Sequence, residues 1–265
     1  IFDTLTLFPR PIARYNTNLN AGCTPLNVNF SDSSHLAQSY LWSFGNGNTS
    51  TNSTSAQAFN NNGFFDTLVS SKLVITSLRG CRDSITQTVR VYPLPSVNFT
   101  ANNNDGCGPL NVNFNNNSTP NDTGTINIMT FSWDFGNGLS SNQRNPSTQF
   151  ISSLVQDSIY TVSLIGFSEH SCVDTASRNI RVYPKPLAMF SMVDSTGCAP
   201  LSTSFINQST PYDTGSINDM SFLWNFGNGL GSISRDDTVV FNASYSQDTT
   251  YNVSLIATSE HGCID

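Results

Sequence analysis

Apolar and polar residues alternate with a period of two along most of the chain. The alternation is clearest in residues 110–114, 131–135, 160–164 and 180–182. A period of two places every second side chain on one face of a β-strand, so each segment is predicted to be a strand with one buried face. Asn-Gly and Gly-Asn pairs supply the positive-φ residues that tight hairpin turns need. The chain is therefore predicted to be all-β.

One hexapeptide, Trp-x-Phe-Gly-Asn-Gly, occurs three times at a spacing of 91 residues. The copies are residues 42–47, 133–138 and 224–229, and Cys81, Cys172 and Cys263 repeat at the same spacing. The second and third repeats share a seven-residue insert, in residues 118–127 and 209–218, that the first repeat lacks. About seven short strands per repeat predict an immunoglobulin-like β-sandwich.

Each repeat is preceded by a Pro-x-Pro sequence, at residues 9–11, 93–95 and 184–186. Two prolines one residue apart make a short, stiff, extended connection. We therefore expect three tandem sandwiches stacked as a rod. The expected boundaries are residues 1–11 for the last strand of a preceding repeat plus its linker, 12–92 for repeat 1, 93–183 for repeat 2 and 184–265 for repeat 3, which lacks its last strand.

Residues 1–8 resemble the last strand of a repeat, and residue 265 falls where the first two repeats begin theirs. We expect a segment like residues 1–8 to complete the third sandwich, either within a longer chain or from a neighbouring subunit. A stable, monomeric 265-residue chain with a well-ordered third domain would contradict this expectation.

The composition excludes several classes of protein. Charged residues make up 11% of the chain, and Glu and Lys occur twice each, which is too few to cover many surface helices. The net charge of −7 argues against binding to a phosphate backbone. No apolar run approaches the roughly 20 residues of a membrane-spanning helix.

The hexapeptide and the cysteine motifs together resemble the PKD domain. Gly-Cys-x-Pro-Leu occurs at residues 22–26, 106–110 and 197–201, and Gly-Cys-x-Asp at 80–83 and 262–265, with Ser171 in place of the glycine in the second repeat. This variant is similar to the giant surface proteins of gliding bacteria, which are exported by type IX secretion. The resemblance covers nearly the whole chain.

The resemblance implies a non-catalytic structural or adhesive stalk or filament outside a bacterial cell. Its expected partners are further repeats of the same chain, neighbouring copies and surface glycans or polysaccharide, and no cofactor is expected. The alternative is a spacer or carbohydrate-binding module of a secreted hydrolase. Flanking sequence discriminates the two, because further repeats favour the stalk and an adjoining catalytic domain favours the spacer.

No catalytic set is evident, so the chain is not expected to be an enzyme. Its three histidines are His35, His170 and His261, and the last two lie in Glu-His-x-Cys sequences. They could be metal ligands or general bases, but no second His or Cys stands at metal-ligand spacing, which favours a polar turn.

Calcium is a second hypothesis, because some PKD domains of secreted enzymes hold Ca²⁺ through carboxylates. The usual Asp of the hexapeptide is Asn46, Asn137 or Asn228 here, and each exchange removes a charge from the site. Asp122 and Asp213 in the insert are the remaining calcium candidates. A turn stabilised by side-chain hydrogen bonds to the backbone is the alternative, and it is favoured.

The repeated tryptophans, Trp42, Trp133 and Trp224, are in phase with two phenylalanines on one strand face. That phase favours a core role over a sugar-stacking platform. An Asp-Ser/Thr pattern resembles the O-glycosylation acceptor of the same bacterial group, although it also suits a strand start. The candidate glycan carriers are Thr67, Ser84, Ser158, Thr175 and Thr238.

Two cysteines per repeat suggest disulfides in a secreted protein. Pairing within each repeat would join Cys23 to Cys81, Cys107 to Cys172 and Cys198 to Cys263. In this sandwich class, however, the first cysteine lies at the end where the chain exits and the second at the end where it enters, roughly 20 Å apart, whereas a disulfide tolerates about 7 Å between Cα atoms. We therefore prefer Cys23–Cys172 and Cys107–Cys263 across the joints, with Cys81 and Cys198 bonded to neighbouring repeats. A shifted strand would restore the simple pairing.

Overall fold

A computed structural model describes residues 3–122, 125–213 and 215–265. These residues contain no α-helix, and the all-β prediction is confirmed. The first repeat holds β1 (Tyr15–Thr17), β2 (Ala21–Cys23), β3 (Leu26–Asp32), β4 (Ser39–Ser43), β5 (Thr49–Ser50), β6 (Thr54–Phe59), β7 (Thr67–Thr76) and β8 (Arg82–Tyr92).

The second repeat has the same order of strands as the first, whereas the described residues of the third contain no counterpart of β2 or β8. Each of these two repeats also has one 3-10 turn that overlaps the end of the shared insert. The second repeat holds β9 (Phe99–Ala101), β10 (Asp105–Cys107), β11 (Leu110–Asn116), η1 (Ile126–Ile128), β12 (Thr130–Asp134), β13 (Ser140–Ser141), β14 (Ser147–Phe150), β15 (Ser158–Phe167) and β16 (Val173–Tyr183). The third repeat holds β17 (Phe190–Met192), β18 (Leu201–Asn207), η2 (Ile217–Asp219), β19 (Ser221–Asn225), β20 (Gly231–Ser232), β21 (Asp237–Phe241) and β22 (Ser254–Thr258).

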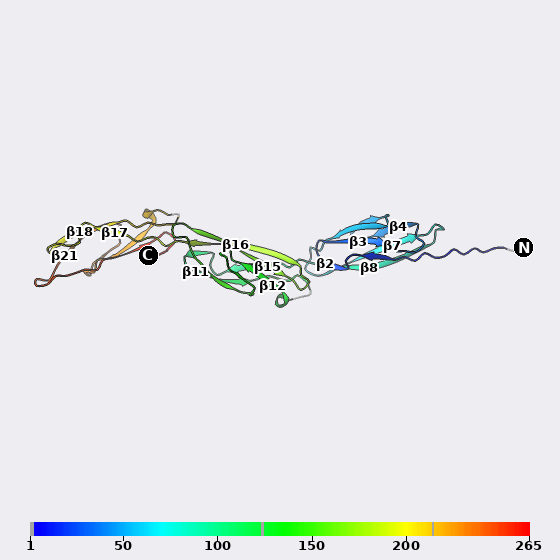
Figure 1. Cartoon of the computed structure of the whole chain (residues 1–265), viewed down its shortest axis with the longest axis horizontal. Helices are drawn as coiled ribbons and strands as arrows, with labels where there is room; N and C mark the ends of the chain where they lie inside the picture. The colour runs from blue at the N-terminus through cyan, green and yellow to red at the C-terminus, as the bar shows by residue number, and fades with distance from the viewer. Residues whose placement is uncertain (1–2, 123–124, 214) are drawn as a thin grey trace. The chain divides into compact units, whose positions relative to one another are not determined.

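The strands of each repeat form two sheets, as an immunoglobulin-like sandwich requires. The first repeat has the orders β1-β3-β6 and β2-β8-β7-β4-β5, and the second has β14-β11-β9 and β10-β16-β15-β12-β13. The third has β17-β18-β21 and β20-β19-β22. The chain is thus a tandem series of immunoglobulin-like sandwiches. Figure 1 labels many of their strands and colours the chain from the N-terminus to the C-terminus.

By contacts, the chain divides into two compact units. Unit 1 comprises Ile1–Phe99, Asn116–Ser132 and Leu164–Ala176, and unit 2 comprises Thr100–Asn115, Trp133–Ser163 and Ser177–Asp265. Unit 1 therefore contains the whole first repeat with one part of the second, and unit 2 contains the whole third repeat with the other part. Each unit includes one junction between consecutive repeats.

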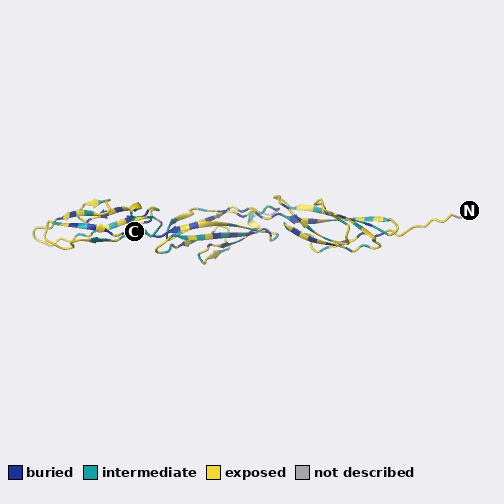
Figure 2. Ribbon diagram, turned by 90° about the horizontal axis from the view of Figure 1, so that it is seen from above, coloured by how far each residue is buried: buried dark blue, intermediate teal, exposed yellow. Residues whose placement is uncertain are grey.

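The core of the first repeat lies between its two sheets. In β3, Leu26, Val28 and Phe30 are buried while the residues between them are exposed, so the alternation in the sequence is the alternation in burial (Figure 2). Trp42 of β4 is fully buried, and its indole N–H donates to the Asn52 carbonyl at 2.8 Å. The same bond recurs from Trp133 and Trp224, which are also buried.

The backbone conformation and hydrogen bonds of the hexapeptide turn account for the glycine and the asparagine in its sequence. Gly136 has a φ of +70°, and a Cβ there would lie 2.7 Å from the Thr161 carbonyl oxygen, so no larger residue fits. The Asn137 side chain accepts from the Leu139 N–H at 3.0 Å and donates to the Gln149 carbonyl at 3.1 Å. An aspartate could make the first of these bonds but not the second, which accounts for asparagine at this position.

The third repeat is more open than the first. β7 pairs with β8 over its whole length, whereas β22, which corresponds to β7, has β19 as its one strand partner among the described residues. A groove of about 520 Å³ lies on this repeat, and its lining includes the core residues Phe205 and Phe241 and the partly buried Val253. Completion of this sandwich by a segment like residues 1–8 stays a prediction, and Ile1 and Phe2 lie outside the described residues.

Candidate functional site

Two disulfides join consecutive repeats. Cys23 is bonded to Cys172 in unit 1, with 5.5 Å between their Cα atoms. Cys107 is bonded to Cys263 in unit 2, with 5.4 Å between their Cα atoms. The structure therefore brings together the pairs that the strand topology favours over pairing within a repeat. Cys81 and Cys198 are free thiols, one partly buried and one exposed.

A short parallel strand places the first cysteine of each bond. β2 pairs in parallel with the end of β8 and sets Cys23 opposite Tyr92, and β10 pairs likewise with β16 and sets Cys107 opposite Tyr183. The glycine before Cys107 lets this strand approach the next one, because a Cβ on Gly106 would lie 2.8 Å from the Leu110 side chain.

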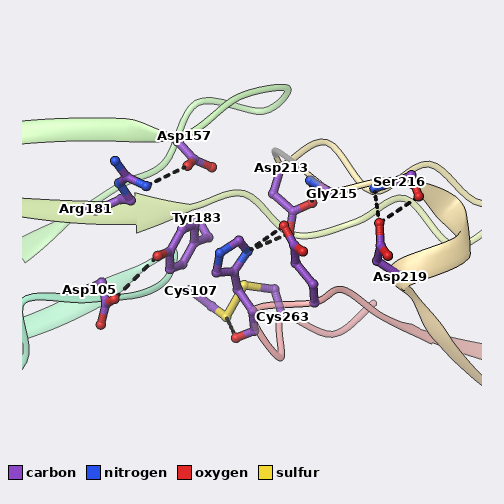
Figure 3. Close-up of polar contacts among 12 residues, drawn as sticks. Asp105, Cys107, Asp157, Arg181, Tyr183, Asp213, Gly215, Ser216, Asp219 and Cys263 are labelled. Atoms are coloured by element: carbon purple, nitrogen blue, oxygen red, sulfur yellow. Dashed lines mark hydrogen bonds and ion pairs between the residues drawn. A yellow bond between two sulfur atoms is a disulfide. The ribbon is translucent and has the colours of Figure 1, made fainter.

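A stacked histidine and tyrosine lie beside each disulfide. Tyr92 stacks on His170, and Tyr183 stacks on His261, each with 3.7 Å between ring centroids and 18° between planes. The His261 carbonyl oxygen lies 3.9 Å from the Cys107 sulfur. That approach is a contact and not a hydrogen bond, because a disulfide sulfur carries no proton. Figure 3 shows Tyr183 beside the disulfide of Cys107 and Cys263. Each junction thus combines a covalent bond with a flat, tightly packed aromatic pair.

The aspartate of the Gly-Cys-x-Asp motif, or of its Ser-Cys-x-Asp counterpart in the second repeat, bonds to the backbone just before the first strand of its repeat. Its carboxylate accepts a backbone N–H at the start of the domain in all three repeats, at 2.8–2.9 Å; the pairs are Asp83 with Ala13, Asp174 with Val97 and Asp265 with Ala188. In the first repeat Arg10 also pairs with Asp83 at 2.7 Å. The Ala13 N–H, followed by the Arg10 guanidinium, holds the pKa of Asp83 below its usual range.

We expect Asp83→Asn to destabilise the first repeat at pH 7 and to have a smaller effect at pH 3. A lowered pKa in the folded state means that ionised Asp83 stabilises the fold above the unfolded-state pKa of about 4, and that this contribution is lost as the pH falls through the folded-state value. Melting temperatures of both proteins at the two pH values measure the difference. The exposed Asp3→Asn is the control, and an Asp83→Asn deficit that is equally large at pH 3 would contradict the assignment.

The structure also gathers carboxylates around the two stacked histidines. His170 lies with Asp122 and Glu169, and His261 lies with Asp213 and Glu260, and in each trio the donor atoms are within 4.8 Å of one another. The two calcium candidates from the sequence therefore lie next to the two Glu-His pairs. Spacing along the chain missed this arrangement, because Asp122 is 47 residues before Glu169.

The other candidate residues lie apart from these clusters. The hexapeptide asparagines Asn46, Asn137 and Asn228 each accept a backbone N–H two residues ahead, as in the turn that the sequence favoured. The tryptophan rings are at most 1% exposed and offer no face to a sugar. Among the candidate glycan carriers, Thr67, Ser84, Thr175 and Thr238 are exposed and Ser158 is partly buried.

Comparison with known proteins identifies the kind of domain. Residues 9–92 match the PKD domain family model. The PKD1 domain of the Vibrio cholerae metalloprotease PrtV is 29% identical over 31% of this chain and 98% of that chain, with a TM-score of 0.27. The PKD1 domain of Vibrio anguillarum Epp is 24% identical over 31% and 94%, with a TM-score of 0.27.

A 1.5-MDa bacterial ice-binding adhesin is 10% identical over 97% of this chain and 96% of that chain, with a TM-score of 0.37. No curated protein matches the chain. Among the described residues, no helix has the length and apolar character needed to cross a bilayer. Residues 9–92 thus resemble a PKD domain in sequence and fold as an immunoglobulin-like sandwich, and the other two repeats carry the same hexapeptide and cysteines.

Proposed function

We propose that this chain is part of a non-catalytic, extracellular stalk or filament of PKD-like repeats at a bacterial cell surface. The observation that carries the proposal is the pair of equivalent disulfides between consecutive repeats. A spacer needs no covalent bond between its domains beyond the linker. In a protein under tension, by contrast, a disulfide keeps consecutive repeats joined where noncovalent contacts alone could slide or unfold. Structural disulfides also persist in oxidising, extracellular compartments.

The proposed repeats are residues 12–92, 93–183 and 184–265, with residues 1–11 as a last strand and linker. In this scheme Cys81 and Cys198 pair with further repeats, since Cys81 corresponds to Cys172 and Cys263, and Cys198 to Cys23 and Cys107. The partners are further repeats or neighbouring copies, together with surface glycans. Thr67, Ser84, Ser158, Thr175 and Thr238 carry O-glycans in this proposal, and an intact mass of native material equal to the bare polypeptide would refute that part.

Immunogold labelling of intact cells of the source organism tests the proposed function. We expect antibodies against this chain to label stalks or filaments on unpermeabilised cells. The matched control is a strain in which the gene is deleted, on which no such label should remain. Label that appears after permeabilisation alone, or antigen confined to the soluble culture fluid beside a hydrolase activity, would contradict the proposal.

A further inference from the structure

The two Asp-Glu-His clusters have the composition of metal sites, and each lies next to a disulfide junction. We propose that Asp122, Glu169 and His170 bind one divalent transition-metal ion, and that Asp213, Glu260 and His261 bind another, with Zn²⁺ as the ion that suits them. Imidazole nitrogens and Asp or Glu carboxylate oxygens are both zinc ligands, and Zn²⁺ sites with three protein ligands keep a water as the fourth. The inference goes beyond the proposed function and does not depend on it.

The distances in the third-repeat cluster fit such an ion. His261 Nδ1 lies 3.2 Å from Asp213 Oδ2 and 3.7 Å from Glu260 Oε1. Ligands about 2.0 Å from a tetrahedral zinc ion are about 3.3 Å apart. The three donors therefore need only small movements to share one ion.

Burial of the Asp213 side chain raises the free energy of its carboxylate when no cation lies beside it. The Asp213 side chain is fully buried, while the side chains of His261 and Glu260 are 25% and 37% exposed. Among the described residues, the one ion pair recorded for Asp213 is with His261, and no lysine or arginine pairs with it. A buried carboxylate is stabilised by a positive charge, and a bound divalent ion supplies one.

The backbone holds the Asp213 carboxylate in a fixed orientation. The Gly215 N–H donates to Asp213 Oδ1 at 3.2 Å, so Oδ2 is the oxygen that faces the imidazole (Figure 3). A Cβ on Gly215 would lie 3.0 Å from the Glu260 carboxylate and 3.2 Å from Asp213 Oδ1, which shows how closely Gly215 approaches both acids. An outer hydrogen bond that orients a ligating carboxylate is a regular feature of metal sites.

The second repeat gathers the same three residue types. Asp122 is buried, and His170 Nε2 lies 3.5 Å from Glu169 Oε1. The histidine rings of both repeats have the same stacking geometry on their tyrosines. The cluster is thus a repeated feature and not a single coincidence of side chains.

The first repeat provides an internal comparison. It lacks the insert that carries the aspartate, and Leu78 and Arg79 stand where the other repeats have Glu-His. The insert aspartate and the Glu-His pair are thus both present in the second and third repeats and both absent from the first. An aspartate and a Glu-His pair that bind one ion together are expected to occur together and to be absent together.

The position of the ion predicts what it does. In the third repeat it would tie the insert loop to the loop between Glu260 and Cys263, and it would fix the ring that stacks on Tyr183 of the second repeat. The ion therefore would stiffen the same junction that the disulfide closes. Imidazole ligation favours zinc and similar transition metals over Ca²⁺, which prefers oxygen ligands.

Isothermal titration calorimetry with Zn²⁺ on the oxidised chain tests the inference. Free thiols also bind zinc, so the titration uses a Cys81→Ser/Cys198→Ser background. We expect two ions per chain, one after His170→Ala or His261→Ala, and none after both substitutions. The exposed His35→Ala is the matched control and should retain two.

Asp213→Asn is the second test, because it keeps the shape and the Gly215 bond while it removes the charge. We expect it to abolish one of the two sites without a change in circular dichroism. X-ray absorption should show nitrogen and oxygen ligands at about 2.0 Å and no sulfur. The proposal is overturned by an absence of zinc binding, by two ions retained in the double histidine variant, or by displacement of the zinc by equimolar Ca²⁺.

Discussion

Pulled from both ends, the oxidised chain is expected to extend to about a third of the length of the reduced chain. In the oxidised chain the force passes from Cys23 to Cys172, back along the chain to Cys107, and across to Cys263. Roughly 90 residues lie on that path, which gives about 300 Å at full extension, against about 900 Å for the whole reduced chain. Single-molecule force spectroscopy with and without reductant measures both lengths.

Two variants make this experiment specific. Cys81→Ser/Cys198→Ser removes the free thiols and should leave the short extension unchanged. Cys23→Ser/Cys263→Ser opens both bonds and should give the long extension without reductant. Equal lengths for the oxidised and reduced wild-type chains would show that the bonds do not carry the load.

Trp42→Ala is expected to cost the first repeat about 3–5 kcal/mol, the range for loss of a large buried aromatic side chain. The Trp42 ring stacks on Phe44 at 5.7 Å, meets Tyr15 edge-on at 5.0 Å, and is fully buried. Its removal leaves a cavity in the centre of the core and an Asn52 carbonyl without its indole donor. Denaturant unfolding followed by amide hydrogen exchange in β4 and β7 isolates this repeat from the others.

Leu41→Ala is the matched control, since Leu41 is the neighbour of Trp42 on β4 and is 53% exposed. It should change stability by no more than about 0.5 kcal/mol. A Trp42→Ala effect as small as that of Leu41→Ala would mean that the ring does not hold the two sheets together.

The sequence predicted those features that depend on local periodicity or on exact repetition. Alternation located β11, β12, β15 and β16, and the repeated tryptophan marked the core. The topology of the sandwich class was enough to favour Cys23–Cys172 over Cys23–Cys81, because the two cysteines of one repeat lie at opposite ends.

Apart from the disulfides, the sequence did not predict contacts between residues that lie far apart along the chain. The bond from Asp83 to the Ala13 N–H spans 70 residues, and no local pattern indicates it. The signal that could have found it is the repetition of Gly-Cys-x-Asp, because a polar residue that recurs beside a strand start in each copy has a partner. The meeting of Asp213 with His261 could have been found from the joint presence of the insert and the Glu-His pair.

The central claim is that consecutive repeats are covalently joined, and disulfide mapping of the native chain by trypsin tests it most directly. All six cysteines fall in different tryptic peptides, because Lys72, Arg79, Arg82, Arg144, Arg178 and Arg235 separate them. The account predicts that, without reductant, the peptide of residues 15–72 is linked to that of residues 145–178, and the peptide of residues 91–144 to that of residues 236–265. A link between the peptide of residues 15–72 and that of residues 80–82, which contains Cys81, would contradict it.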